Sequence, residues 1–115
     1  MPLGAKEVVL TKRAAATLAE LERGNDPKAV SITRRVRAFK GILLADCLHG
    51  EVDPKDRIPK TPRKEYGLEN LYVEDLPSFW RLLYTIVRDG SVRYIVIIEI
   101  VDHRKYSKWF PGRRR

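Results

Sequence analysis

The chain has 115 residues, 43% of them hydrophobic and 33% charged, and this length predicts a single domain over residues 1–115. Its net charge of +8 favours a polyanionic partner, either a nucleic acid or an acidic protein, although many basic domains bind no nucleic acid. The single cysteine excludes an intrachain disulfide, and the two histidines lie too far apart for metal-ligand spacing, so we expect no metal and no other cofactor.

The sequence carries no sign of a membrane or secretory segment. Its longest apolar run, YIVII at residues 94–98, has the length of a strand and falls well short of the roughly 20 residues of a membrane helix. The N-terminus also lacks the apolar run of a signal peptide. We therefore expect a cytoplasmic protein without a membrane partner. The scarcity of Gln, Asn, Cys and Met beside many Lys, Arg and Glu is typical of proteins from hot environments.

The N-terminal quarter of the chain predicts a strand followed by a helix. The β-branched run EVVL (7–10) indicates the strand. Thr11 can cap a helix over residues 12–23 through its hydroxyl. Gly24 is expected to end that helix because glycine tolerates a positive φ.

A second helix is predicted from the pair Asp26 and Pro27, which suit the cap and the first turn. His49, shortly after this helix, is expected to be a solvated residue. The two helices together predict a helical hairpin. Apolar residues at spacings of three and four mark the buried side of the second helix: Ala29, Ile32, Val36, Phe39, Leu43 and Cys47.

Residues 50–67 differ in composition from the helices before them: they contain three prolines and five Lys or Arg residues. Proline removes ladder donors, so this segment is predicted to be a loop or an irregular edge strand. Basic residues here and in the C-terminal tail are candidate RNA contacts because they attract phosphate. These candidates are Lys60, Arg63, Lys64, Arg113, Arg114 and Arg115.

The last part of the chain predicts three strands, over residues 68–76, 79–87 and 92–101, and a short helix over residues 103–110. The Asp-Gly pair at 89–90 predicts a tight turn between the second and third of these strands. The order of elements indicates an α+β fold, in which an N-terminal strand and a helical hairpin pack on an antiparallel meander sheet with a short C-terminal helix.

The expected hairpin register places Arg81 on a central strand. With residues 89–90 as the loop, Arg88 pairs with Ser91, and Arg81 lies opposite Ile98. Both faces of these two strands are mostly apolar, which predicts that both are covered.

Arg81 is the exception on its face, because a buried guanidinium is costly unless it is paired. Two interpretations remain open. Arg81 pairs with an acid, such as Asp102 or Glu99, or it faces a cleft and binds an anion.

The segments SFWRLLYTIVRDG (78–90) and DHRKYSKWF (102–110), with the apolar strand between them, resemble the RelE/ParE superfamily of type II toxins. The shared pattern is aromatic-Arg-Leu-x-Tyr on a strand, a hairpin, an apolar strand and a short basic helix. The likeness covers most of the chain and is specific over residues 68–110. The RelE branch implies an endoribonuclease that cuts mRNA in the ribosome without metal and is silenced by a cognate antitoxin.

The resemblance also implies site residues. Cleavage through the ribose 2′-OH needs a base for its proton, a cation for the phosphate and an acid for the leaving oxygen. Arg81 and Arg104 match the arginines of the family, and a guanidinium suits phosphate. His103 is a candidate acid or base, or a surface residue at the helix start, and Tyr106 is a candidate substitute for a late tyrosine.

The sequence departs from the family at three catalytic positions. Tyr72 and Glu74 stand where RelE has two lysines, and Phe110 stands where its late tyrosine falls. Glu74 is either a base or a polar residue on an exposed face, and Phe110 with Trp109 is either a docking anchor or a base-stacking pair. The alternative function is therefore a non-catalytic protein of this fold that binds RNA, gyrase or an antitoxin peptide.

Overall fold

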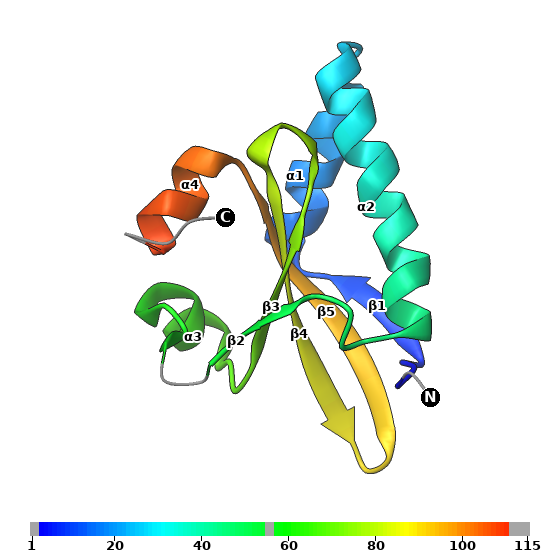
Figure 1. The fold of residues 1–115 in the computed structure, drawn as a ribbon, viewed down its shortest axis with the longest axis vertical. Helices are drawn as coiled ribbons and strands as arrows, with labels where there is room; N and C mark the ends of the chain where they lie inside the picture. Colours follow the sequence, from blue (N-terminus) through cyan, green and yellow to red (C-terminus); the bar gives the residue numbers. More distant parts are fainter. Residues whose placement is uncertain (1–2, 55–56, 111–115) are drawn as a thin grey trace.

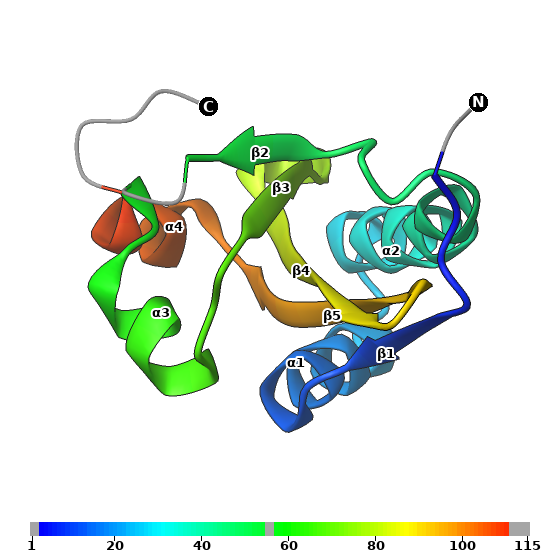
Figure 2. The same cartoon turned by 90° about the horizontal axis from the view of Figure 1, so that it is seen from below.

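The computed structural model describes residues 3–54 and 57–110, in which helices cover both faces of a central sheet. In chain order the elements are β1 (Glu7–Leu10), α1 (Lys12–Arg23), α2 (Pro27–Ala45), β2 (Glu51–Asp53), α3 (Lys60–Tyr66), β3 (Leu71–Asp75), the 3-10 turn η2 (Pro77–Phe79), β4 (Arg81–Asp89), β5 (Val92–Val101) and α4 (His103–Trp109). Helices α1 and α2 lie on one face of the sheet, and α3 and α4 lie on the other (Figure 1; Figure 2). The expected α+β class and the helical hairpin on one face are confirmed.

The sheet is mixed rather than purely antiparallel. Over the described residues its strand order is β1-β5-β4-β3-β2. Strands β2 to β5 form the predicted antiparallel meander, while β1 joins the outer side of β5 in parallel. The two helices between β1 and β2 supply the long connection that a chain needs to cross from one edge of the sheet to the other.

The caps of the first two helices are those that the sequence indicates. The hydroxyl of Thr11 accepts a hydrogen bond from the backbone N–H of Ala14 at 3.1 Å, and the carboxylate of Asp26 accepts one from Ala29 at 2.8 Å. Gly24 caps the end of α1 at Arg23, as expected, but the expected positive φ is wrong, because its φ is −75°. The chain leaves α1 in an extended conformation, so a left-handed residue is not needed there.

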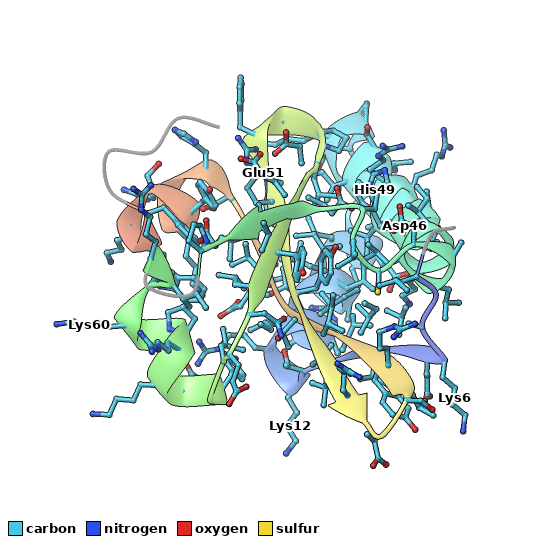
Figure 3. All side chains as sticks on the ribbon, turned by 60° about the horizontal axis from the view of Figure 1, so that its bottom comes forward. Lys6, Lys12, Asp46, His49, Glu51 and Lys60 are labelled. Carbon is cyan, nitrogen blue, oxygen red and sulfur yellow. The ribbon has the colours of Figure 1, made fainter. Side chains whose placement is uncertain are left out.

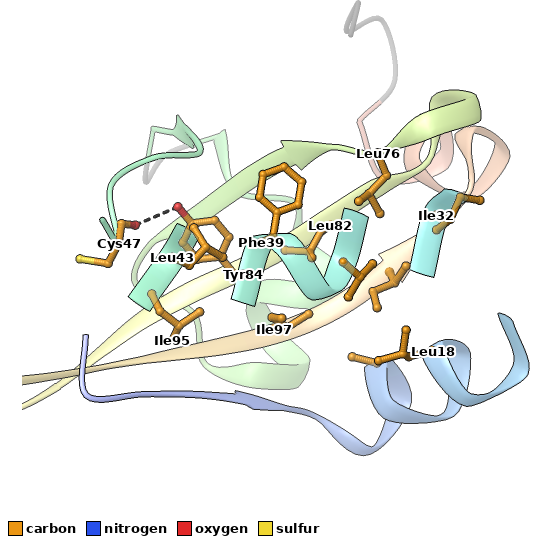
Figure 4. Packing of buried hydrophobic residues seen from close by; sticks show 13 residues of the cluster. Leu18, Ile32, Phe39, Leu43, Cys47, Leu76, Leu82, Tyr84, Ile95 and Ile97 are labelled. Carbon is orange, nitrogen blue, oxygen red and sulfur yellow. Dashed lines mark hydrogen bonds between the residues drawn. The ribbon is translucent and has the colours of Figure 1, made fainter. Parts of the chain in front are cut away.

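One core fills the space between the sheet and helices α1 and α2 (Figure 4). The buried side of α2 agrees with the predicted stripe, although Cys47 follows the end of that helix. The Tyr84 hydroxyl reaches across this core, where it donates to the Cys47 carbonyl at 2.8 Å and accepts from the Gly50 N–H at 3.0 Å. This link fixes the segment after α2 against β4.

A second core lies on the opposite face of the sheet, under α3 and α4. Its members are fully or nearly buried and come from both strands and helices: Ile58, Leu68, Leu71, Val73, Leu83, Ile98, Val101, Tyr106 and Phe110. The prediction that β4 and β5 are covered on both faces is therefore confirmed.

The turn between β4 and β5 is displaced by one residue from the expected loop at 89–90. Asp89 pairs with Val92, so the two loop residues are Gly90 and Ser91. Gly90 takes φ +63°, the left-handed conformation that favours glycine at the first position of such a turn.

The register shifts again further along the same two strands. An irregularity lies between Leu83 and Tyr84, where β5 carries one extra residue. Arg81 consequently pairs with Val101 and not with Ile98. The sequence pattern gave no sign of this bulge because both strands are apolar on both faces.

The proline-rich segment contains a helix that the sequence did not indicate. Its start does form a short edge strand, β2, as one of the two expectations had it. The helix α3 follows, with Pro62 in its first turn, where a missing N–H breaks no intrahelical bond. Gly67 ends α3 in the left-handed conformation, with φ +63°.

The strand predicted from residue 68 begins only at Leu71. Just before Leu71, the side chain of Asn70 makes the hydrogen bonds that a strand backbone would make to β4. Its side-chain oxygen accepts from the N–H of Ile86 at 2.8 Å, and its amide nitrogen donates to the carbonyl of Ile86 at 2.9 Å. The next strand begins at Arg81 rather than at residue 79, because η2 occupies the start of the predicted segment.

Candidate functional site

Arg81 is buried and contacts three protein groups. Its residue is 3% exposed, and its Nη1 donates to the carbonyl of Trp80 at 2.9 Å. Its Nε lies 3.2 Å from Oδ1 of Asp75, as an ion pair rather than a well-aligned hydrogen bond. Its Cζ lies 5.3 Å from the ring centroid of Tyr106. The partner acid is therefore Asp75, on the neighbouring strand β3, rather than Asp102 or Glu99.

Tyr106 belongs to the core beneath α4. It is 2% exposed, and its ring stacks on Phe110 with centroids 4.5 Å apart. Phe110 is also 2% exposed, so the closing aromatic residues dock α4 onto the sheet. The structure thus brings Arg81 and Tyr106 together, as the resemblance implies, but it buries both.

His103 opens α4 and is exposed. Its ring lies beside Phe79, with centroids 6.0 Å apart, and Phe79 is 69% exposed. Phe79 and the preceding Ser78 have φ values of +62° and +60°. Such values are costly for residues other than glycine, so the turn between β3 and β4 holds strain while it displays an aromatic ring.

Arg104, the next residue of α4, lines an open hollow of about 470 Å³. Two further cations, Lys105 and Lys108, line the hollow together with Trp109 and Asp102. The ammonium of Lys105 sits 5.3 Å from the ring centroid of Trp109. The Asp102 carboxylate caps the helix by accepting from the N–H of Lys105 at 2.9 Å. The hollow therefore combines three cations with one aromatic wall.

A buried acid ties the α4 region to the rest of the molecule. Glu99 is 1% exposed and pairs with Arg13 at 3.0 Å and with Lys105 at 3.4 Å. Arg13 also pairs with Glu65 of α3 at 3.0 Å, so the network joins α1, α3, β5 and α4. Among the described residues, neither Arg104 nor Lys108 enters an ion pair, which leaves their charges available.

The basic residues predicted in the proline-rich segment lie on α3. Lys60, Arg63 and Lys64 are exposed, and Lys60 points away from the body of the protein (Figure 3). Helices α3 and α4 cover the same face of the sheet, so these cations share a side of the molecule with the α4 hollow (Figure 2). The tail candidates Arg113, Arg114 and Arg115 lie outside the described residues.

The two positions that the family fills with lysines are not exposed. Tyr72 stacks on Tyr84 at a centroid distance of 5.1 Å, within the first core. Glu74 is 6% exposed, and its Oε2 lies 2.6 Å from Nδ1 of His49. Burial raises the pKa of the Glu74 carboxyl, and the hydrogen bond and charge of His49 oppose that rise only in part.

The pair of Glu74 and His49 was missed from the sequence, which indicated a solvated histidine. The two residues are 25 positions apart, and their meeting depends on how the segment after α2, which carries His49 (Figure 3), returns to the sheet. The one signal was Glu74 itself, an acid on a strand whose neighbours on the same face are apolar.

An open hollow of about 260 Å³ adjoins this pair, on the edge of the sheet at β2 and β3. Its lining comes from α2 and from the two strands: Arg35, Phe39, His49, Glu51, Val73, Glu74 and Asp75. The guanidinium of Arg35 lies 4.6 Å from the ring centroid of Phe39, whose ring is 6.1 Å from that of His49. The residues that line the hollow therefore include one imidazole, three carboxylates and one guanidinium.

Two further classes of site were sought over residues 3–54 and 57–110. No helix in these ranges is both long and apolar enough to cross a membrane. No group of three or more His, Cys, Asp or Glu side chains in them is arranged to hold a metal ion.

No protein-family model matches the sequence, no curated protein matches it, and no solved structure matches its fold. The fold and the site geometry alone therefore describe the class of protein. It is an α+β fold with a mixed sheet, a cationic hollow on its closing helix and a histidine–carboxylate pair at the opposite sheet edge.

Proposed function

We propose that the protein is a RelE-like toxin that binds RNA through α4, cleaves mRNA in the ribosome without a metal ion, and is silenced in the cytoplasm by a cognate antitoxin. The observation that carries the proposal is the cationic hollow on α4, with Arg104, Lys105 and Lys108 around Trp109. The order of elements, a strand and two helices followed by an antiparallel meander and a closing basic helix, also agrees with that resemblance.

The chemistry of the hollow suits single-stranded RNA. The guanidinium of Arg104 can meet two phosphate oxygens at once, while Lys108 supplies a point charge. The ring of Trp109 offers a partly exposed surface for a base, with the cation of Lys105 beside it. The exposed cations of α3 extend this basic side and would add salt-dependent attraction along the strand.

A second candidate function is a non-catalytic RNA-binding or antitoxin-binding protein of the same fold. The burial of Arg81 and Tyr106 favours it, because neither side chain can touch a substrate in this conformation. In this alternative Arg81 and Tyr106 join β4 to α4 and the RNA is held without being cut.

RNA binding is tested with a labelled single-stranded oligonucleotide by fluorescence anisotropy at 50 to 200 mM salt. We expect the double variant Arg104→Ala/Lys108→Ala to bind more weakly and to lose about 1.4 from the slope of log K against log salt, at about 0.7 for each phosphate contact. The matched control removes two exposed cations from α2, as Lys28→Ala/Arg34→Ala. Equal losses in both double variants would show only general charge attraction and would contradict the assignment to α4.

Cleavage is tested by incubating purified protein with ribosome-bound mRNA and mapping the new ends. Attack by the 2′-OH leaves a 2′,3′-cyclic phosphate and a 5′-hydroxyl, and we expect these ends. Intact mRNA, together with retained RNA binding by the α4 hollow, would favour the non-catalytic alternative.

A further inference from the structure

The His49–Glu74 pair has the form of a proton relay. The carboxylate of Glu74 is buried, whereas the side chain of His49 is 44% exposed. Because Nδ1 faces Glu74 at 2.6 Å, an ionised carboxylate holds the proton on Nδ1 and leaves the Nε2 lone pair directed away from it. Within the part of the chain that the structure describes, Nε2 of His49 has no hydrogen-bond partner. This nitrogen is therefore available to take a proton from a bound molecule.

If Glu74 served only to pack the core, its burial would lower the stability of the fold relative to an apolar residue at the same position. A carboxylate in an otherwise apolar sheet face costs free energy unless its bonds are satisfied, and an apolar residue would fill the same place at lower cost. Glu74 sits between Tyr72 and Leu76 on a face that contributes to the first core. The imidazole that meets it stands at the rim of an open hollow rather than within the core.

Arg35 supplies the positive charge of the hollow. It is exposed, packs on Phe39 and, among the described residues, enters no ion pair. The acids that line the hollow are Glu51, Glu74 and Asp75. Asp75 pairs with Arg81 and Glu74 with His49, while Arg35 also attracts the charge of Glu74, so an anion in the hollow would share Arg35 with that carboxylate.

A chain of side-chain contacts links the hollow to the RNA-binding side. Glu74 and Asp75 are neighbours on β3, and their side chains point to opposite faces of the sheet. Asp75 pairs with Arg81, which in turn contacts Tyr106 of α4. The two hollows lie on opposite faces of the sheet, so a single strand bound on α4 has to pass around the sheet to enter the second hollow.

We propose that this hollow is the cleavage site for the RNA backbone, with His49 as the general base, Glu74 as its positioning residue and Arg35 as the phosphate ligand. The inference rests on the proposed RNA function and gives it a site that differs from the positions implied by the resemblance. The substrate class is a single-stranded RNA phosphodiester with a free 2′-OH.

The proposed step balances without a cofactor. Nε2 of His49 takes the proton of the 2′-OH, the 2′-oxygen forms a bond to phosphorus, and the bond from phosphorus to the 5′-oxygen breaks. The leaving 5′-oxygen takes a proton from water in the open hollow, and the resulting hydroxide accepts the proton held by His49. Arg35 stabilises the extra charge on the phosphate oxygens while the bonds change. The products are a 2′,3′-cyclic phosphate and a 5′-hydroxyl.

The test uses the full chain and measures single-turnover cleavage of a labelled oligonucleotide and of ribosome-bound mRNA. We expect His49→Gln to slow cleavage about 100-fold or more, in the range for loss of a general base. Glu74→Gln keeps the shape of the side chain and should slow cleavage at least 10-fold while RNA affinity stays within twofold. A structural role alone would not separate rate from affinity in this way.

Matched variants exclude indirect effects. Arg35→Ala should slow cleavage, whereas Arg37→Ala, which removes an exposed cation two positions along α2, should not. Melting curves show whether each variant is folded at the assay temperature. If His49→Gln is not folded there, Glu74→Gln and Arg35→Ala carry the test, since one is isosteric and the other changes an exposed residue.

Each outcome decides between the inference and the proposed function. Cleavage by the wild type that is equally fast in His49→Gln overturns this site and leaves the nuclease proposal standing. RNA binding without cleavage overturns the site and the nuclease proposal but retains RNA binding. A greater loss in His103→Gln than in His49→Gln also overturns the site, because it moves the acid–base chemistry to α4. A wild type that neither binds nor cleaves RNA overturns both.

Discussion

Truncation of Arg81 is expected to damage the fold before it can report on function. Arg81→Ala removes a charged donor from the Trp80 carbonyl, worth about 1.5 to 3 kcal/mol. It also removes a cation over the ring of Tyr106, worth about 0.5 to 2 kcal/mol. The ion pair with Asp75 adds less than about 1 kcal/mol, because the carboxylate is 69% exposed. These contributions add to about 2 to 6 kcal/mol, and we expect the free energy of unfolding to fall by about 3 kcal/mol, in the lower part of that range.

Thermal and urea unfolding give the measurement. A domain of this size loses about 4 °C of Tm for each kcal/mol, so Arg81→Ala should melt roughly 12 °C lower than the wild type. Two companion variants separate the contributions. Arg81→Met retains most of the volume and should cost about 1 to 2 kcal/mol. Asp75→Asn removes only the exposed partner charge and should cost less than about 1 kcal/mol.

The reasoning is refuted if Arg81→Ala loses less than about 1 kcal/mol and yet abolishes RNA cleavage at a temperature where it is folded. That result would assign Arg81 to the substrate, as the family resemblance implies. A loss of growth inhibition in cells could not decide the matter alone, because an unfolded variant would give the same result.

Two further substitutions test other parts of the fold. Tyr84→Phe leaves the Cys47 carbonyl and the Gly50 N–H without their partner, so we expect a loss of about 2 kcal/mol in urea unfolding, and a change below 0.5 kcal/mol would contradict the role of this hydroxyl. Ser78→Gly relieves a left-handed residue at a cost in chain entropy and should raise stability by about 0.5 kcal/mol, whereas the same change at Ser31 in α2 should lower it by a similar amount; equal effects at both sites would contradict the strain.

Sequence reasoning succeeded where local chemistry decides the structure. The caps Thr11 and Asp26 satisfy the first N–H groups of a helix with their own side chains, so a few neighbouring residues are enough to predict them. The strand over residues 92–101 was placed with its observed bounds, because a long apolar run followed a turn signal. The buried side of α2 followed from spacing alone.

Sequence reasoning failed where a residue or a pattern is compatible with two different local structures. Pro62 argues against a helix in general but not in the first turn, and nothing local shows that α3 begins at Lys60. Gly24 allows a positive φ without requiring it. The bulge in β5 preserves a mostly apolar pattern on both faces, so the register of Arg81 could not be read from hydrophobicity.

Of the candidate site, the sequence could predict only the charged residues that stand in apolar strands. Glu74, Arg81 and Glu99 are charged residues in mostly apolar strands, and each could be recognised as unusual from the sequence. Their partners could not, because they come from elements whose relative placement depends on the whole fold. His49 reaches Glu74 from the segment after α2, and Arg13 reaches Glu99 from α1.

These three buried charges differ in the chemistry of their partners. Arg81 joins β4 to Asp75 of β3 and to Tyr106 of α4, and Glu99 joins β5 to Arg13 of α1 and Lys105 of α4. Glu74 meets the imidazole of His49, which lines a hollow. The ion-pair partners of all three have side chains 41% to 69% exposed, so what sets His49 apart is its imidazole, the group that proteins use most often for acid–base catalysis. On this physical ground the chemistry of this protein is expected at His49 rather than at Arg81.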